Sequence, residues 1–228
     1  MDLGLKAKNA IIFGASSGLG RAAAHSLASE GCNTTLIARD SEKLKTVSKE
    51  ILQAHKVSSD YIVADLTKDH DVSSLLTGIS DRKYDILINN TGGPPPSNPI
   101  DTDNNVLQLF VKSILLNTIR ITNSLIPSMI EKNWGRVITI TSSGVVQPID
   151  NLSVSNTIRP AVTGFMKTLS NQIAEHGVTV NTVMPGRITT ERTLEVNTQK
   201  AKSLGVSYDE AMSISSNEIP IRRYGTPE

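Results

Sequence analysis

Three glycines, Gly14, Gly18 and Gly20, stand where a short apolar run gives way to an amphipathic stretch. Glycine lets a backbone turn tightly and lets a pyrophosphate approach the main-chain amides with no Cβ in the way. A following helix would add free N–H groups and a partial positive charge. The spacing differs from the commoner Gly-x-Gly-x-x-Gly, and a glycine-rich turn alone is also typical of an ordinary loop. The segment predicts a phosphate-binding turn formed by Gly14, Ser16, Ser17, Gly18, Leu19 and Gly20.

Composition excludes several classes of protein. The 228 residues include 23 basic and 22 acidic side chains, a formal net charge of +1. The chain has no basic patch of the kind that would indicate a nucleic-acid partner. Its apolar runs are too short to predict a membrane span. The first residues lack the features of a signal peptide, so we expect a cytoplasmic protein. One cysteine, and four histidines without metal-ligand spacing, predict neither a disulfide nor a metal site.

Short apolar segments rich in β-branched residues alternate with longer helical patterns along the whole chain. This alternation predicts an α/β fold in one domain spanning residues 1–228, a doubly wound parallel sheet between two layers of helices. The predicted strands are Ala10–Phe13, Thr34–Ala38, Tyr61–Ala64, Ile86–Asn89, Arg136–Thr141 and Val178–Met184. The predicted helices are Gly18–Ser29, Ser41–His55, Asp69–Ile79, Asp103–Lys132 and Ser155–His176.

Residues that follow the predicted strands should line one crevice, because a doubly wound sheet binds ligands beyond the carboxyl ends of its strands. Their convergence is stronger evidence for a site than any single motif. They are Gly14–Gly20, Arg39, Asp65 and Leu66, Asn89–Gly93, Ser142 and Ser143, and Pro185 and Gly186.

Arg39 bears on the choice of cofactor. An acidic residue there would accept hydrogen bonds from a ribose 2′-hydroxyl, whereas an arginine suits a 2′-phosphate, so we expect NADP(H) rather than NAD(H). Asp40, the next residue, has the pattern of a helix cap. Asp65 can accept a hydrogen bond from the adenine amino group, or this segment can simply start the next helix.

These motifs resemble the short-chain dehydrogenase/reductase family, within it the 3-oxoacyl-(acyl-carrier-protein) reductases. Gly14–Gly20 matches the family's cofactor turn, Asn89–Gly92 resembles its Asn-Asn-Ala-Gly motif, and Gly177–Gly186 is similar to the segment closing the nicotinamide end. The resemblance implies a seven-stranded Rossmann fold that forms homodimers or homotetramers through two long helices. It places the carboxamide against Ile188 and Thr190, and the rest of the cofactor along Asp65, Leu66, Asn89, Thr91, Gly92, Arg159, Pro185 and Gly186.

The family's catalytic Asn, Ser, Tyr and Lys are only partly matched. Ser142 stands at the serine position, and Ser155, thirteen residues on, stands where the resemblance places the tyrosine. Arg159 follows where it places the lysine, and the asparagine position falls on Ile114, with Asn117 three residues on. No tyrosine in the chain is followed by lysine four residues later.

A hydroxyl at position 155 is a far weaker acid than a phenol, whose pKa is about 10. Loss of a positioned general acid costs roughly 10²–10⁴-fold in rate, unless Tyr208 lies in the substrate loop and replaces it. We expect an NADP(H)-dependent oxidoreductase that acts on a small carbonyl or alcohol with an altered proton donor, with Ser142, Ser155 and Arg159 at the reacting centre. The alternative is a dinucleotide-binding protein with little or no turnover, a sensor or an assembly subunit.

Residues 219–228 resemble the segment before the family's final helix and seventh strand, so we expect both to be absent from this chain. The Gly92–Pro96 loop and the Thr189–Ser216 region should border the substrate, although neither identifies it.

Overall fold

A parallel sheet of six strands lies at the centre of the computed structural model, which describes residues 1–228. The strands are β1 (Asn9–Phe13), β2 (Asn33–Ala38), β3 (Ser59–Val63), β4 (Ile86–Asn90), β5 (Gly135–Ile140) and β6 (Val178–Val183). Their order is β3-β2-β1-β4-β5-β6, so the chain runs outward from β1 to one edge and then crosses to the other side of β1. The reversal between β1 and β4 creates the crevice in which such sheets bind ligands.

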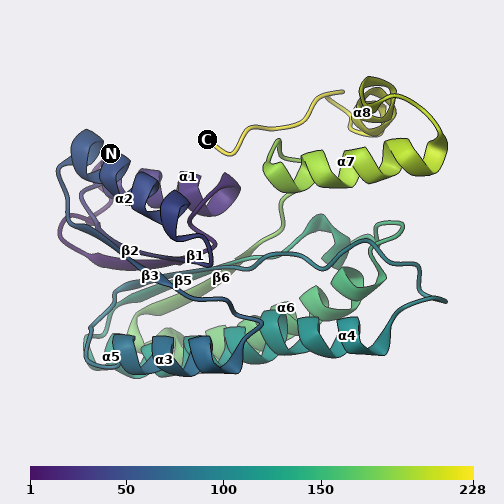
Figure 1. The fold of residues 1–228 in the computed structure, drawn as a ribbon. Helices are drawn as coiled ribbons and strands as arrows, with labels where there is room; N and C mark the ends of the chain where they lie inside the picture. Colours follow the sequence, from purple (N-terminus) through teal and green to yellow (C-terminus); the bar gives the residue numbers. More distant parts are fainter.

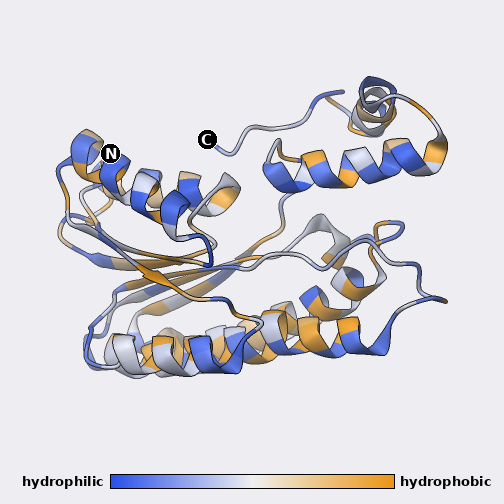
Figure 2. Ribbon diagram, in the orientation of Figure 1, coloured by the Kyte–Doolittle hydropathy of each residue, from blue (hydrophilic) through white to orange (hydrophobic).

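Helices cover both faces of this sheet (Figure 1). On one face lie α1 (Gly18–Ser29) and α2 (Ser41–His55). On the other lie α3 (Asp69–Ile79), α4 (Asn104–Phe110), α5 (Asn117–Glu131) and α6 (Ser153–Ile173). Figure 2 shows hydrophobic residues beside hydrophilic ones along the helices, as expected for helices that bury one side.

Strand β1 is buried on both faces because its side chains alternate between two hydrophobic clusters. Ile11 and Phe13 belong to the cluster on the α3, α5 and α6 side. Ala10 and Ile12 belong to the cluster under α1 and α2. The four residues from Ala10 to Phe13 are all apolar and buried, which is typical of a covered parallel sheet, while Asn9 at the start of the strand is exposed.

The predicted α/β fold is confirmed. Helices α1, α2 and α3 begin and end at the predicted residues, and the strand ends shift by one or two residues, as where β3 begins at Ser59 rather than Tyr61. The seventh strand of the family's fold has no counterpart in this sheet.

The prediction of one helix over Asp103–Lys132 is wrong in detail. A π-helical segment, Val111–Leu116, separates α4 from α5, and such segments occur often at functional sites. The stretch Asn104–Glu131 is also long and apolar enough to cross a membrane by length and composition, contrary to the sequence-based expectation. In this structure 44% of its most apolar window is buried, and Ile121, Leu125 and Met129 of α5 belong to the hydrophobic core.

A second correction concerns the region 189–216, which the sequence analysis left without regular structure. It contains α7 (Glu191–Leu204) and most of α8 (Tyr208–Asn217), which pack mainly against each other and lie apart from the sheet (Figure 1). We call residues 187–225 the α7–α8 lobe.

Helix α6 begins at Ser153, two residues before the predicted start, and ends in a 3₁₀ turn.

We predict that Gly20→Ala destabilises the protein by about 1–3 kcal/mol or more, the cost of forcing extra atoms into a packed interior. A Cβ on Gly20 would lie 2.1 Å from the Gly14 carbonyl oxygen, a backbone atom that cannot move aside cheaply. Gly78→Ala in α3 is the matched control, because a Cβ there meets nothing within 4 Å. Urea unfolding of the three proteins is the measurement. Equal midpoints for both variants would contradict the packing argument.

Candidate active site

The turn between β1 and α1 is fixed by close backbone contacts. Gly14 has φ +61°, and a Cβ on it would lie 2.6 Å from both the carbonyl oxygen and the Nδ2 of Asn90. Gly18 also has positive φ, and its missing Cβ would lie 3.1 Å from Thr190 Cγ2. At the N-cap of α1, the Ser17 side chain accepts no hydrogen bond, and no acidic residue occupies the first turn. The first-turn amides of α1 therefore remain without a side-chain cap.

Arg39 lies exposed just beyond β2 and makes no hydrogen bond or ion pair. Next to it, Asp40 caps α2 as the sequence predicted, accepting a hydrogen bond from Lys43 N at 3.0 Å. Asp65 lies just beyond β3 and accepts hydrogen bonds from the backbone and side chain of Thr67. Burial raises the pKa of Asp65, but these hydrogen bonds and the nearby positive charges outweigh it, so its pKa lies below the usual value. The following helix starts later, at Asp69.

A pocket of about 10 Å³, the space of roughly one water molecule, lies at the carboxyl ends of β4 and β5. Its lining includes Asn89, Thr91, Ile114, Thr139 and Arg159. Asn89 is buried and donates hydrogen bonds to Thr122 Oγ1 at 3.0 Å and Thr139 Oγ1 at 3.3 Å. The structure thus brings Asn89 and Thr91, at the end of β4, together with Arg159 from α6. The sequence analysis predicted the first two from their place at a strand end, and Arg159 from the position of the family's lysine.

Arg159 is 9% exposed and has no carboxylate partner. Its Nε donates to Ser155 Oγ at 3.1 Å, and its Nη1 donates to the carbonyl oxygens of Ile140 and Thr141, each at 3.3 Å. Burial, and then the positive charge of Arg192, lower the pKa of Arg159 to about 10. The side chain therefore remains a cation at neutral pH, stabilised by main-chain carbonyl dipoles at the end of β5.

Ser142 is separate from this pair. Its Oγ accepts a hydrogen bond from Gly144 N at 3.1 Å, and no hydrogen bond joins it to Ser155 or Arg159. Ile114 is buried in the π-helical segment and lines the pocket. Asn117 does not replace it, because its Nδ2 donates instead to the carbonyl oxygen of Leu66 at 2.9 Å.

The segment after β6 is held between the sheet and the end of the chain. The Pro185 carbonyl accepts a hydrogen bond from Ser143 N at 3.0 Å, while Gly186 is exposed. Thr189 N donates to the Gly225 carbonyl at 2.9 Å, and Gly225 N donates to the Arg187 carbonyl at 3.0 Å. Ile188 lies beside Gly225, and Thr190 caps α7. Thr190 lies against Gly18 of the glycine turn. The sequence analysis assigned this turn to the pyrophosphate and Thr190 to the carboxamide.

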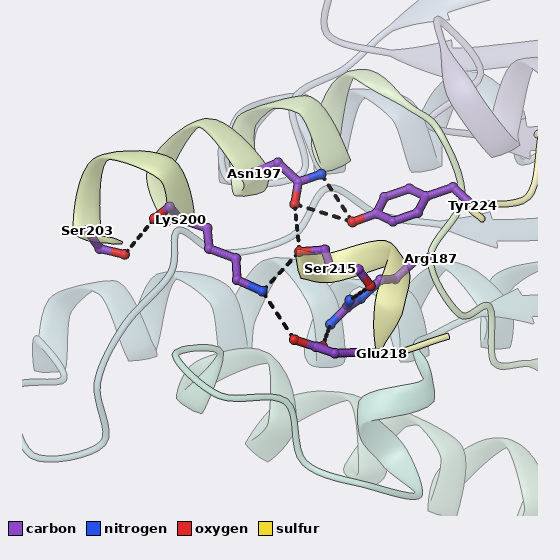
Figure 3. Close-up of polar contacts among 7 residues, drawn as sticks. All are labelled: Arg187, Asn197, Lys200, Ser203, Ser215, Glu218 and Tyr224. Atoms are coloured by element: carbon purple, nitrogen blue, oxygen red, sulfur yellow. Dashed lines mark hydrogen bonds and ion pairs between the residues drawn. The ribbon is translucent and has the colours of Figure 1, made fainter. Parts of the chain in front are cut away.

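A polar network joins α7, α8 and the chain end (Figure 3). Asn197 is 3% exposed, and its Oδ1 accepts hydrogen bonds from Ser215 Oγ and Tyr224 Oη, both at 3.3 Å. Lys200 Nζ donates to Ser215 Oγ at 3.0 Å and pairs with Glu218 at 3.3 Å. Arg187 also pairs with Glu218. These contacts fix the two helices of the lobe relative to each other.

Two contacts of α7 were missed by the sequence analysis. Arg192 donates to the Pro94 carbonyl, and Glu191 pairs with Lys43 of α2 at 2.8 Å.

The sequence contains signals for the ends of helices α7 and α8. Gly205 adopts the left-handed conformation common at helix ends, and Ser207-x-x-Glu210 forms a capping box at the start of α8.

The family model of the short chain dehydrogenases matches residues 8–201, and the chain belongs to this family. It is 28% identical to the 3-oxoacyl-(acyl-carrier-protein) reductase FabG of Aquifex aeolicus, with 100% of this chain and 88% of that protein covered. It is 29% identical to the inactive hydroxysteroid dehydrogenase-like protein 1 of Homo sapiens, with 82% of this chain but only 58% of that protein covered.

Among solved structures, the L-sorbose reductase of Gluconobacter frateurii, complexed with NADPH and L-sorbose, superimposes with a TM-score of 0.92. It is 26% identical, with 100% of this chain and 88% of that chain covered. The resemblance inferred from the motifs is confirmed at the level of the family. The roles of Ser142, Ser155 and Arg159 stay predictions.

We predict that Asn197→Ala loosens the α7–α8 lobe, because it leaves the buried hydroxyl of Ser215 without its acceptor, at a cost of about 1–3 kcal/mol. Gln199→Ala is the control, since Gln199 is exposed on the same helix and makes no hydrogen bond. Hydrogen exchange of the peptides covering residues 187–225 is the measurement. Exchange in Asn197→Ala that matches the control would show that the network does not hold the lobe.

Proposed function

We propose that this protein is an NADP(H)-dependent oxidoreductase that transfers a hydride between the nicotinamide and a small carbonyl or alcohol, with a proton donor that differs from its family's. The observation that carries the proposal is the convergence of the glycine turn, Arg39 and Arg159 at the carboxyl edge of one parallel sheet. The sorbose reductase structure with NADPH supports the same cofactor. The family supports a homodimer or homotetramer as the working form, and a cytoplasmic location is part of the proposal.

The residues at this edge fit a dinucleotide. The glycine turn leaves no Cβ between the first-turn amides of α1 and an approaching pyrophosphate, and these amides have no side-chain cap. Arg39 would hold the 2′-phosphate, because its guanidinium is exposed and unpaired. Gly92 and Gly186 have open space where a Cβ would stand, so a ligand can approach both backbones.

When bound, NADPH would supply the hydride. Arg159 would stabilise negative charge that develops on a carbonyl oxygen, because its cation is preorganised by fixed hydrogen bonds in a buried site. Ser155 already accepts a hydrogen bond from Arg159, so its own proton is free to be donated to an oxygen. The pair therefore supplies an alkyl hydroxyl and a guanidinium in place of a phenol and an ammonium.

The second candidate function is a dinucleotide-binding protein with little or no turnover. It is favoured by the lack of any hydrogen bond between Ser142 and the Ser155–Arg159 pair. One relative's name, an inactive hydroxysteroid dehydrogenase-like protein, is in line with it. The two candidates share the cofactor site and differ in the rate of hydride transfer.

We predict that NADPH binds more tightly than NADH and that Arg39→Asp abolishes the preference. A charge-assisted hydrogen bond to a phosphate contributes about 1.5–3 kcal/mol, so NADPH affinity should fall by roughly ten- to hundred-fold. Lys49→Asp, an equal charge change at an exposed position of α2, should leave both affinities unchanged. Calorimetric titrations measure this. Equal affinity of the native chain for NADPH and NADH would exclude the assignment of Arg39.

We predict that Ser155→Tyr combined with Arg159→Lys raises turnover of a generic ketone by about ten-fold or more, given the usual contribution of a general acid. Each single change should do less, because the phenol needs the neighbouring cation. NADPH oxidation by the four proteins with a shared ketone panel is the measurement. Turnover of a panel ketone by the native chain at about 10 s⁻¹, a typical enzyme rate, would show that the donor is not impaired and would direct the search to another acid, such as Tyr208.

A further inference from the structure

Two guanidinium groups lie close to Gly93, and one of them belongs to Arg159 of the candidate active site. If Gly93 carried a Cβ, that atom would lie 3.5 Å from Arg192 Nε and 3.8 Å from Arg159 Nη2. The first group comes from α7 and the second from α6, so residues far apart in sequence meet at this glycine. Like charges placed this close repel one another unless an anion lies near them.

Each guanidinium keeps one N–H edge unused. Arg159 donates through Nε and Nη1, and its Nη2 has no partner. Arg192 donates through Nη2 to the Pro94 carbonyl and through Nη1 to Glu195 at 3.3 Å, and its Nε has no partner. The two unused donors are the two atoms nearest to Gly93 from their respective side chains. The contacts already made hold the side chains in place and direct the free edges toward the same space.

The charge around this space is unbalanced. Arg159 is nine-tenths buried, and its pKa is lowered by burial and by Arg192, with no acidic group acting in the opposite direction. The one carboxylate that pairs with either guanidinium is that of Glu195, which contacts Arg192 Nη1 where both side chains are exposed to solvent. A buried cation without a counter-ion is costly, and the position suits an anionic ligand.

We propose that the substrate carries a carboxylate, which Arg192 and Arg159 bind beside Gly93. This inference rests on the proposed function, because it names the class of substrate as an oxo acid or hydroxy acid. Two N–H donors from separate guanidinium groups suit the two oxygens of a carboxylate. Arg192 is then a specificity-determining residue, because it is not among the residues to which the cofactor is assigned.

The test compares anions with neutral molecules of the same shape. Acetoacetate and acetoacetamide, and 2-oxobutanoate and 2-oxobutanamide, are titrated calorimetrically into the full chain with NADP⁺, which cannot reduce them. We expect at least one anion to bind about ten- to hundred-fold more tightly than its amide, the range that a charge-assisted hydrogen bond gives. Equal affinities within both pairs would overturn the proposal.

Variants of Arg192 and Glu195 test which residue causes the preference for the anion. Arg192→Gln should remove most of the preference for the anion and leave NADPH affinity unchanged, and Arg192→Lys should restore part of it. Glu195→Gln, which frees Arg192 from its exposed partner, should leave the preference intact or increase it. An anion preference that persists in Arg192→Gln would overturn the assignment. Failure of NADPH to bind the native chain would instead count against the proposed function, since the anion titrations can also be made without cofactor.

Discussion

The contact between the glycine turn and Asn90 is the constraint on which the site depends. Gly14 and Gly20 approach each other and Asn90 more closely than any Cβ would allow, so α1 begins directly above the carboxyl ends of β1 and β4. This position directs the first-turn amides of α1 into the crevice at the switch between the two halves of the sheet. Without that contact the strand ends would still be neighbours, but the helix would not face the space they share.

Electrostatics divides the crevice into two regions. At one end an exposed, unpaired Arg39 follows β2, and at the other the buried Arg159 is stabilised by carbonyl groups at the end of β5. A buried charge without an ion pair usually destabilises a fold. Its presence here supports the proposal that the charge serves binding or chemistry rather than stability, since perturbed groups often cluster at functional clefts.

The fold was predictable because its signals are local. The apolar strands, the 3.6-residue periodicity of α1, α2 and α3, and the glycine turn each specify structure within about ten residues. The strand order then places Asn89 and Thr91 in the crevice by topology, whereas Arg159 reaches it from α6. The π-helical segment Val111–Leu116 was not predictable, since its shift in hydrogen bonding leaves the helical pattern almost unchanged. Helices α7 and α8 were missed although Gly205 marks the end of α7 and Ser207-x-x-Glu210 the start of α8, because each helix buries only two residues and so carries few apolar positions. The unused edges of Arg159 and Arg192 are three-dimensional facts that no spacing reveals.

The α7–α8 lobe is joined to the rest of the molecule by two kinds of bond. Near its start, Lys43 and Glu191 form an ion pair in which both side chains are about half exposed, and dissolved salt screens such a pair within about 10 Å at 0.1 M ionic strength. Close by, Arg192 donates a hydrogen bond to the carbonyl oxygen of Pro94, a neutral acceptor, and salt affects such a bond less than an ion pair. Ionic strength therefore acts unequally on the two contacts, because it weakens the one with α2 and leaves the one with the Gly92–Pro96 loop in place. As salt rises, the lobe should move away from α2 while it stays beside this loop.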